Sequence, residues 1–233
     1  MKRCLLLLTA LTVATGMASA TTLCTSLVTL QDYITTGTCQ SGSNLFVFAS
    51  DSWTPNGPSV NNGTTFSITP SDVDVTVIDN ADGFGLRFAS VLFNVVNTQL
   101  KAGGLNYTLT YSLNGSAPYI TGASAAVNGL SANGSSSITI NKNEMDAEDE
   151  SNFVQLGLNA NSTSANSAFL PSVQNINISE SIQLTSPAGT QNNAISFTSF
   201  DNSWNVPEPF SLVLMGSGLA LIGLARLRPR SRR

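Results

Sequence analysis

The side chains that could do chemistry in this 233-residue chain are mainly carboxylates, because the sequence contains no histidine. Without an imidazole the chain lacks Ser-His-Asp and Cys-His catalysis, histidine metal sites and the usual proton shuttle at neutral pH. Two carboxylates about 5 to 9 Å apart across a cleft would still suffice for glycoside hydrolysis. With 14 Asp and Glu residues, some such pair is expected by chance. We therefore predict no enzyme, no catalytic residue and no cofactor, and keep a carboxylate-dependent secreted hydrolase as the least favoured alternative.

Two acidic segments are candidates for solvent exposure or for metal binding. The first runs from Glu144 to Glu150, and its adjacent like charges favour a solvated loop. The second contains Asp72, Asp74, Asp79 and Asp82, which offer the hard oxygens that Ca²⁺ prefers near a tight turn. Its spacing is not that of an EF-hand loop, so a turn between strands is the favoured interpretation. We predict no metal site, and calcium binding by these four aspartates stays an open alternative.

The first twenty residues have the pattern of a secretory signal peptide. Lys2 and Arg3 precede an apolar stretch over residues 4–17, and the small residues of 18–20 stand where a signal peptidase cuts. The mature chain is therefore expected to begin near Thr21.

Removal of this segment also removes Cys4 and leaves Cys24 and Cys39, an even pair in an exported chain. A disulfide between them is favoured, with two free thiols as the alternative. It would contribute on the order of 3 kcal/mol by reducing the entropy of the unfolded chain. The spacing matches neither a CxxC redox motif nor a paired zinc knuckle.

Charge is distributed unevenly along the chain. Between Thr21 and Val206 the basic residues are Arg87, Lys101 and Lys142, and they stand against thirteen acidic residues, a net charge of −10. Such a surface repels phosphate backbones, so nucleic acid is not expected as a partner.

An uncharged segment spans residues 210–225 and is followed by a cluster of arginines. Its sixteen residues would measure about 24 Å as a helix, against a hydrocarbon core of about 30 Å. The arginines should stay in the cytoplasm under the positive-inside rule, and their long stems can snorkel to extend the span. A single transmembrane helix is therefore expected, because a buried C-terminal helix of a soluble domain would leave the cluster unexplained. The stop-transfer residues are Arg226, Arg228, Arg230, Arg232 and Arg233.

A Pro-Glu-Pro motif, Pro207, Glu208 and Pro209, stands just before this segment. Two prolines fix φ and remove backbone donors, so the motif should stay extended and accessible to a protease-like groove. The motif, the short hydrophobic span and the arginine-rich end, in this order, resemble the PEP-CTERM sorting signal of exported Gram-negative bacterial proteins. This resemblance implies that an exosortase, a membrane transpeptidase-like enzyme, recognises Pro207 to Pro209 and cuts near them. It also implies an association with exopolysaccharide and biofilm production.

A second, weaker resemblance covers Leu23 to Phe48. One group of PEP-CTERM proteins opens in a similar way, with a cysteine, a Leu-Gln-Asp-Tyr-Ile stretch, a glycine and a second cysteine before an aromatic strand. That group usually has glycine before the second cysteine, where this chain has Thr38. The match implies a fold and no activity.

Most of the remaining sequence is typical of short β-strands. A short helix is expected between a Ser26 cap and Gly37, and residues 107–113 alternate so that two tyrosines and two leucines share one face. This face is interpreted as core in preference to a sugar-binding platform, and Asn114-Gly115 predicts a hairpin after it. The other expected strands are 64–68, 73–77, 86–96, 137–140, 153–158, 173–178, 181–184 and 195–200.

Together these patterns predict a single antiparallel β-sandwich over residues 21–204, between the signal peptide 1–20 and the sorting signal 205–233. The chain would cross the inner membrane, remain anchored once with its tail in the cytoplasm, and reach the cell surface or the medium after processing. Its expected partners are the exosortase, the inner membrane before processing, and extracellular polysaccharide. The expected function is that of a surface or matrix structural protein. The alternative is a carbohydrate-binding or adhesive module that uses exposed aromatics such as Trp53 or Trp204.

Overall fold

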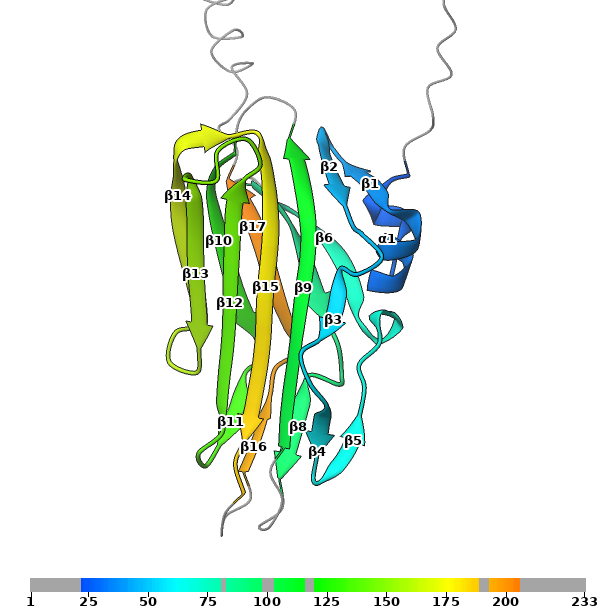
Figure 1. Ribbon diagram of the computed structural model, residues 1–233, viewed down its shortest axis with the longest axis vertical. Coiled ribbons are helices and arrows are strands. Elements are labelled where there is room, and N and C mark those ends of the chain that lie inside the picture. Colours follow the sequence, from blue (N-terminus) through cyan, green and yellow to red (C-terminus); the bar gives the residue numbers. More distant parts are fainter. Residues whose placement is uncertain (1–21, 81–82, 98–102, 116–119, 189–192, 206–233) are drawn as a thin grey trace, which may run out of the picture.

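The computed structural model describes residues 22–80, 83–97, 103–115, 120–188 and 193–205 (Figure 1). In these ranges the chain forms two large antiparallel β-sheets that pack face to face, as the sequence predicts for an all-β protein. Figure 1 shows β9, β15 and β12 in front of β10, β17 and β6. The signal segment 1–20, the Pro-Glu-Pro motif, the uncharged span and the arginine cluster lie outside the described residues.

The first large sheet has the order β1-β2-β9-β15-β12-β13, and all its pairs are antiparallel. β3 and β4 pair with β9 beside β2, and β5 pairs with β4. The strands are β1 (Thr38–Ser41), β2 (Asn44–Val47), β3 (Trp53–Pro55), β4 (Ser59–Asn61), β5 (Thr64–Phe66), β9 (Gly103–Gly115), β12 (Ser137–Asp146), β13 (Phe153–Asn159) and β15 (Asn175–Ser186).

The second large sheet has the order β14-β10-β17-β7-β6, and a small sheet has the order β11-β16-β8. The large one contains β6 (Asp74–Asn80), β7 (Gly83–Ala89), β10 (Ile120–Asn128), β14 (Ser164–Val173) and β17 (Ser199–Asn205). The small one contains β8 (Asn94–Asn97), β11 (Ser131–Asn133) and β16 (Asn193–Ser196).

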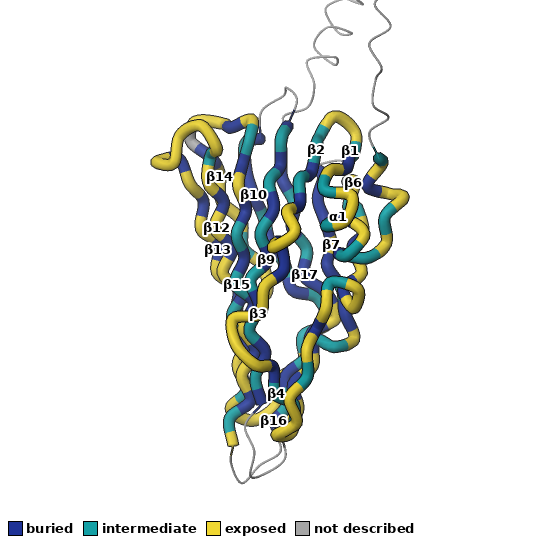
Figure 2. The backbone as a smooth tube through the Cα atoms, turned by 45° about the vertical axis from the view of Figure 1, so that its right-hand side comes forward, coloured by how far each residue is buried: buried dark blue, intermediate teal, exposed yellow. Residues whose placement is uncertain are grey.

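The core lies between the two large sheets and is rich in aromatic rings. In β9 every second residue is buried, so the predicted core face of residues 107–113 is confirmed. Rings from opposite sheets meet there: Tyr111 of β9 lies edge-on to Trp204 of β17 at 6.2 Å, and Phe46 of β2 contacts Phe84 of β7 at 6.1 Å. Figure 2 shows the buried positions alternating with partly buried and exposed ones along the strands.

A short N-terminal helical region packs at the β1–β2 edge. It consists of η1 (Cys24–Ser26) and α1 (Leu30–Thr36), and a further turn, η2 (Pro70–Asp72), precedes β6. α1 ends at Gly37 as predicted, but its cap is Thr29 and not Ser26. Thr29 forms a capping box with Asp32, which Ser26 cannot do because it belongs to η1.

Four predictions of strand boundaries or connections were wrong. Asn114 and Gly115 form the end of β9, whose described partners are β2, β3, β4 and β15, and the next strand, β10, belongs to the other sheet. The stretch 86–96 divides into β7 and β8, and 195–200 divides into β16 and β17, because the chain changes sheet at each place. Conversely, 173–178 and 181–184 were expected as two strands, whereas β15 runs unbroken from Asn175 to Ser186.

No helix within the described ranges is long and apolar enough to cross a bilayer.

Candidate functional site

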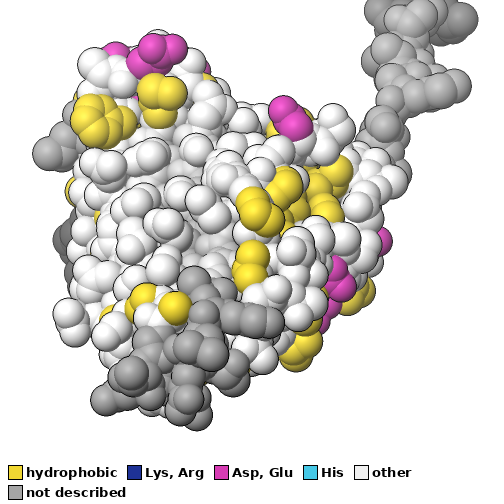
Figure 3. Space-filling model, turned by 60° about the horizontal axis from the view of Figure 1, so that its bottom comes forward, with side chains coloured by type: hydrophobic (Ala, Val, Ile, Leu, Met, Phe, Trp, Pro, Cys, Tyr) yellow, Lys and Arg dark blue, Asp and Glu magenta, His cyan; other side chains and the backbone are white. Residues whose placement is uncertain are grey.

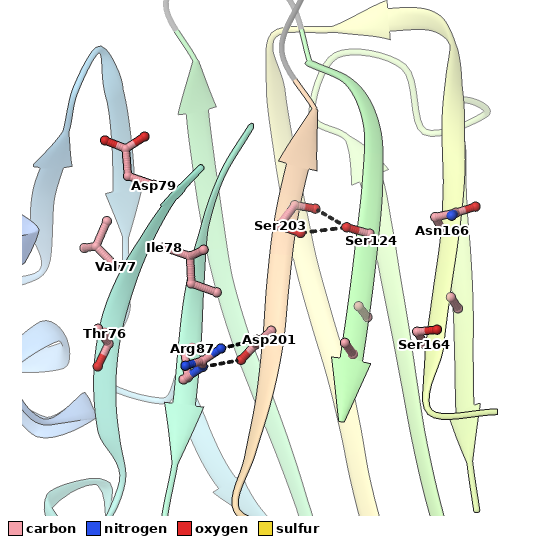
Figure 4. Close-up of a pocket in the computed structure, with 13 residues that line it drawn as sticks. Thr76, Val77, Ile78, Asp79, Arg87, Ser124, Ser164, Asn166, Asp201 and Ser203 are labelled. Carbon is pink, nitrogen blue, oxygen red and sulfur yellow. Dashed lines mark hydrogen bonds and ion pairs between the residues drawn. The ribbon is translucent and has the colours of Figure 1, made fainter. Parts of the chain in front are cut away.

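A polar groove of about 690 Å³ crosses the outer face of the β6-β7-β17-β10-β14 sheet (Figure 4). Strand register sets its floor, because directly opposed residues on neighbouring antiparallel strands point to the same face. One row across the five strands is Thr76, Arg87, Asp201, Ala126 and Ser164.

A second row lies one pleat further along the same strands and consists of Ile78, Gly85, Ser203, Ser124 and Asn166. Hydroxyl groups at its centre bond to each other, since the Oγ atoms of Ser124 and Ser203 are 2.6 Å apart. Because the side chains in the two rows are mostly small, their polar groups are accessible from the groove. Figure 4 shows Asn166 and Ser164 on one side of the groove and Thr76 and Ile78 on the other.

Arg87 and Asp201 form the centre of the groove. The guanidinium donates from Nε and from one terminal nitrogen to the two carboxylate oxygens, both at 2.7 Å. The Arg87 side chain is 48% exposed and that of Asp201 is 17% exposed. The hydrogen bonds to Asp201 raise the pKa of Arg87 above its usual value. The pair fixes the position of the guanidinium and leaves its other N–H donors accessible to a ligand.

The chemistry of this groove suits a neutral, hydroxyl-rich ligand. An ion pair, hydroxyls and an amide provide donors and acceptors side by side. The Arg87–Asp201 pair is neutral as a whole, and the carboxylate of Asp79 also lines the groove. Of the basic side chains in the described ranges, Arg87 is the one in contact with solvent, because Lys142 is buried. The lining residues that the structure describes include no aromatic ring, so stacking is not part of this site.

The outer face of the opposite sheet carries a more apolar hollow of about 570 Å³. Its lining includes Met145 and Phe153, and Phe153 is 64% exposed. Substitution of Phe153 therefore tests whether a ligand binds to the exposed aromatic ring on this face and not to the groove.

A second cluster of chemically active side chains is buried between the sheets. Lys142 of β12 and Glu180 of β15 are directly opposed, and Glu144 lies two residues beyond Lys142 on the same face. Lys142 Nζ is 2.5 Å from Glu144 Oε1 and 3.3 Å from the carbonyl oxygen of Ser124 on β10. All three charged side chains lie in the interior, where uncompensated charge is strongly unfavourable.

Side chains of the opposite sheet complete this buried cluster. Trp204 donates its indole N–H to Glu144 Oε1 at 2.9 Å, and its ring lies 4.7 Å from Lys142 Nζ. Asn202 donates from Nδ2 to Glu180 Oε1 and to the hydroxyl oxygen of Tyr111, the latter at 2.9 Å. The cluster therefore joins β12, β15 and β9 on one side to β17 on the other.

The protonation of this cluster follows from its burial. Burial raises the pKa of Glu180 to about 7, although Lys142 acts in the opposite direction, and the nearby Glu144 raises it further. Burial also raises the pKa of Tyr111 well above its usual value, so its hydroxyl stays protonated. Oε2 of Glu144 and Oε2 of Glu180 have no hydrogen-bond partner among the described residues.

Several residues predicted from the sequence occupy different environments in the structure. Cys24 and Cys39 form the favoured disulfide, with their Cα atoms 4.9 Å apart. Trp53 and Trp204 are buried, so neither is an exposed sugar platform as the carbohydrate-binding alternative supposed. Glu144 is also buried, which corrects the prediction of a solvated acidic loop from residue 144 onward.

The acidic segments otherwise contain turns and caps. Asp72 caps η2 through Thr69, and Asn80 pairs with Gly83 where β6 turns into β7. Asp82 lies outside the described residues. Within the described ranges, no three Asp, Glu or Cys residues are close enough together to hold a metal ion.

Sequence comparison does not assign this chain to a family. It matches no protein-family model. It also has no significant match among curated proteins.

Proposed function

We propose that this protein is an exported, non-catalytic component of the cell surface or extracellular matrix, delivered by its Pro-Glu-Pro sorting signal. The order of Pro207 to Pro209, the uncharged span 210–225 and the arginines behind it supports this proposal. The Cys24–Cys39 disulfide also supports it, because disulfides persist in oxidising compartments.

The position of the last described strand is the observation that carries the proposal. β17 ends at Asn205, two residues before the motif. It is the middle strand of its sheet, between β10 and β7. A cut near Pro207 to Pro209 would therefore leave every described strand in place. This placement supports a signal that can be removed without the loss of a described strand.

Mass spectrometry of the exported protein tests this proposal. The expected C-terminus lies near residues 206–209, and Glu208→Ala is expected to leave the uncut chain in the membrane fraction. Glu148→Ala, at an exposed acidic position in a loop, provides the control and should be processed normally. Recovery of chains ending at Arg233 from the medium would overturn the proposal.

Polysaccharide binding in the groove is a second candidate function. The two polar rows across five strands favour it, because they would present the Arg87–Asp201 pair and neighbouring hydroxyls to successive sugar units. On the face that Figure 3 shows, most of the described surface is neither charged nor hydrophobic, which is consistent with contact to neutral glycans.

Calorimetric titration with purified extracellular polysaccharide tests this second function. Arg87→Gln removes a charged donor from the groove and is expected to weaken binding at least about tenfold, because a hydrogen bond to a charged group contributes roughly 1.5 to 3 kcal/mol. Phe153→Ala on the opposite face is the control and should bind normally. Undiminished binding by Arg87→Gln, together with a loss in Phe153→Ala, would assign the glycan to the other face. Neither result affects the sorting proposal.

A further inference from the structure

The buried Lys142 side chain extends from one sheet to the other. Its Nζ atom contacts the carbonyl oxygen of Ser124 on β10 and the ring of Trp204 on β17, both in the opposite sheet. Asn202 reaches the same region, because it donates to Glu180, the residue directly opposed to Lys142, and it pairs with Ala125, the neighbour of Ser124. An amine and a carboxamide therefore occupy the same dry layer of the core.

The amide nitrogen of Asn202 is surrounded by proton-bearing groups. Glu180 Oε1 and the Tyr111 hydroxyl both accept hydrogen bonds from Nδ2. Because the pKa of Glu180 is raised to about 7, a large fraction of this carboxyl is protonated near neutral pH. A protonated acid against an amide nitrogen is the arrangement required to remove that nitrogen as ammonia.

We propose that Lys142 and Asn202 react with each other to form an intramolecular isopeptide bond between β12 and β17. The Nζ–Cγ bond forms, the Cγ–Nδ2 bond breaks, and one molecule of ammonia leaves. No oxidant, metal or further reactant takes part.

The protons balance through the two glutamates. Glu144, 2.5 Å from Nζ, takes one proton from the ammonium group and leaves a neutral amine that can attack Cγ. Glu180 donates a proton to Nδ2 as it departs and regains one that Nζ loses on forming the amide. Glu144 thus acts as base and Glu180 as acid and base. Trp204 is placed to hold Glu144, since it donates to the same Oε1 atom.

The reaction replaces a buried ion pair with neutral groups. Before it, the core contains an ammonium and a carboxylate, which desolvation disfavours. After it, Lys142 is part of an amide and Glu144 is a neutral acid. This outcome also suits the second oxygen of Glu144, which has no described hydrogen-bond partner, because an unpaired neutral carboxyl is less unfavourable in the interior than an unpaired carboxylate.

Peptide mapping of the exported wild-type protein tests the cross-link directly. The expected product is a branched peptide with the summed mass of the Lys142 and Asn202 peptides less one ammonia, together with resistance to trypsin at Lys142. Ring closure at an Asn-Gly pair such as Asn114-Gly115 also releases ammonia, but it leaves a single unbranched peptide. Separate, unmodified Lys142 and Asn202 peptides from the folded wild type would overturn the proposal.

Two variants assign the groups. Glu180→Gln keeps the volume of the side chain but cannot deliver a proton, so the branched peptide should be lost while circular dichroism shows the native fold. The exposed Glu148→Gln should retain the branched peptide. A branched peptide that persists at Lys142 in Asn202→Ala would identify another acceptor and exclude Asn202. The wild-type map decides the main question even if a variant fails to fold.

Discussion

Trp204 and Glu144 are joined by a 2.9 Å hydrogen bond from the indole N–H to Oε1, although they lie on different sheets. Both residues are fully buried, so the bond is shielded from water and links the two halves of the sandwich at a fixed position. The same oxygen is the ion-pair partner of Lys142. Polar contacts thus fix the relative position of the sheets within a core that is otherwise apolar and aromatic.

Trp204→Phe should destabilise the protein by about 1 to 3 kcal/mol, because it leaves a buried carboxyl with one partner fewer and removes part of a large ring. Urea unfolding measures the change. Phe84→Leu, which removes a ring next to Trp204 and leaves the hydrogen bond in place, is the control for lost volume. Equal losses in the two variants would mean that the hydrogen bond contributes nothing measurable.

Stability should fall between about pH 4.5 and pH 7 because of Glu180. Burial raises its folded pKa to about 7, above the ordinary value of 4.5, so the folded state binds more protons than the unfolded state in this window. The stability present below the window is lost as the pH rises through it, by on the order of 3 kcal/mol. Glu180→Gln should flatten this dependence in urea titrations at pH 5 and pH 8, and Glu148→Gln should not.

The double variant Cys24→Ser with Cys39→Ser should lower the free energy of unfolding by about 3 kcal/mol, the value expected for a loop of 15 residues. The loss should appear in the wild type under reducing conditions as well. A double variant as stable as the oxidised wild type would show that the N-terminal region unfolds without consequence for the sandwich.

Gly85→Ala should be among the most damaging small substitutions in the groove sheet. A Cβ at this position would overlap the Asn202 carbonyl oxygen and lie 2.9 Å from Ser203 Cα, so the backbone of β17 would have to move. We expect a loss of roughly 1 to 3 kcal/mol, typical of overpacking. Gly104→Ala on β9 is the matched control, since its Cβ would come no closer than 3.7 Å to a neighbour. Similar unfolding midpoints for the two variants would contradict the close approach.

The sequence was sufficient to predict the fold class and the disulfide, because alternating apolar residues and an even cysteine pair are local signals. β10 and β14 were missed because alanine, serine and asparagine dominate them and have weak strand preference. Their place in the sheet comes from pairing with neighbours far along the chain. The groove was missed for the same reason, since its two rows exist only once the strand register is known.

The buried cluster did have a local signal. Glu180 stands between Ile178 and Ile182 in an unbroken two-residue alternation, and Lys142 and Glu144 continue the alternation of Ile138 and Ile140. Ending the predicted strands at the last apolar residue placed these charges in loops. A charged residue at an inward position of a strand is better interpreted as a paired core group, whose partners only the structure can identify.

The central position of β17 sets the timing of assembly. Arg87 and its partner Asp201 are 114 positions apart, so the whole intervening chain must be available before β7 and β17 can pair. In an exported chain, nearly the whole domain therefore has to emerge on the far side before its second sheet can close. The second sheet would therefore form late in export, after most of the domain has crossed the membrane.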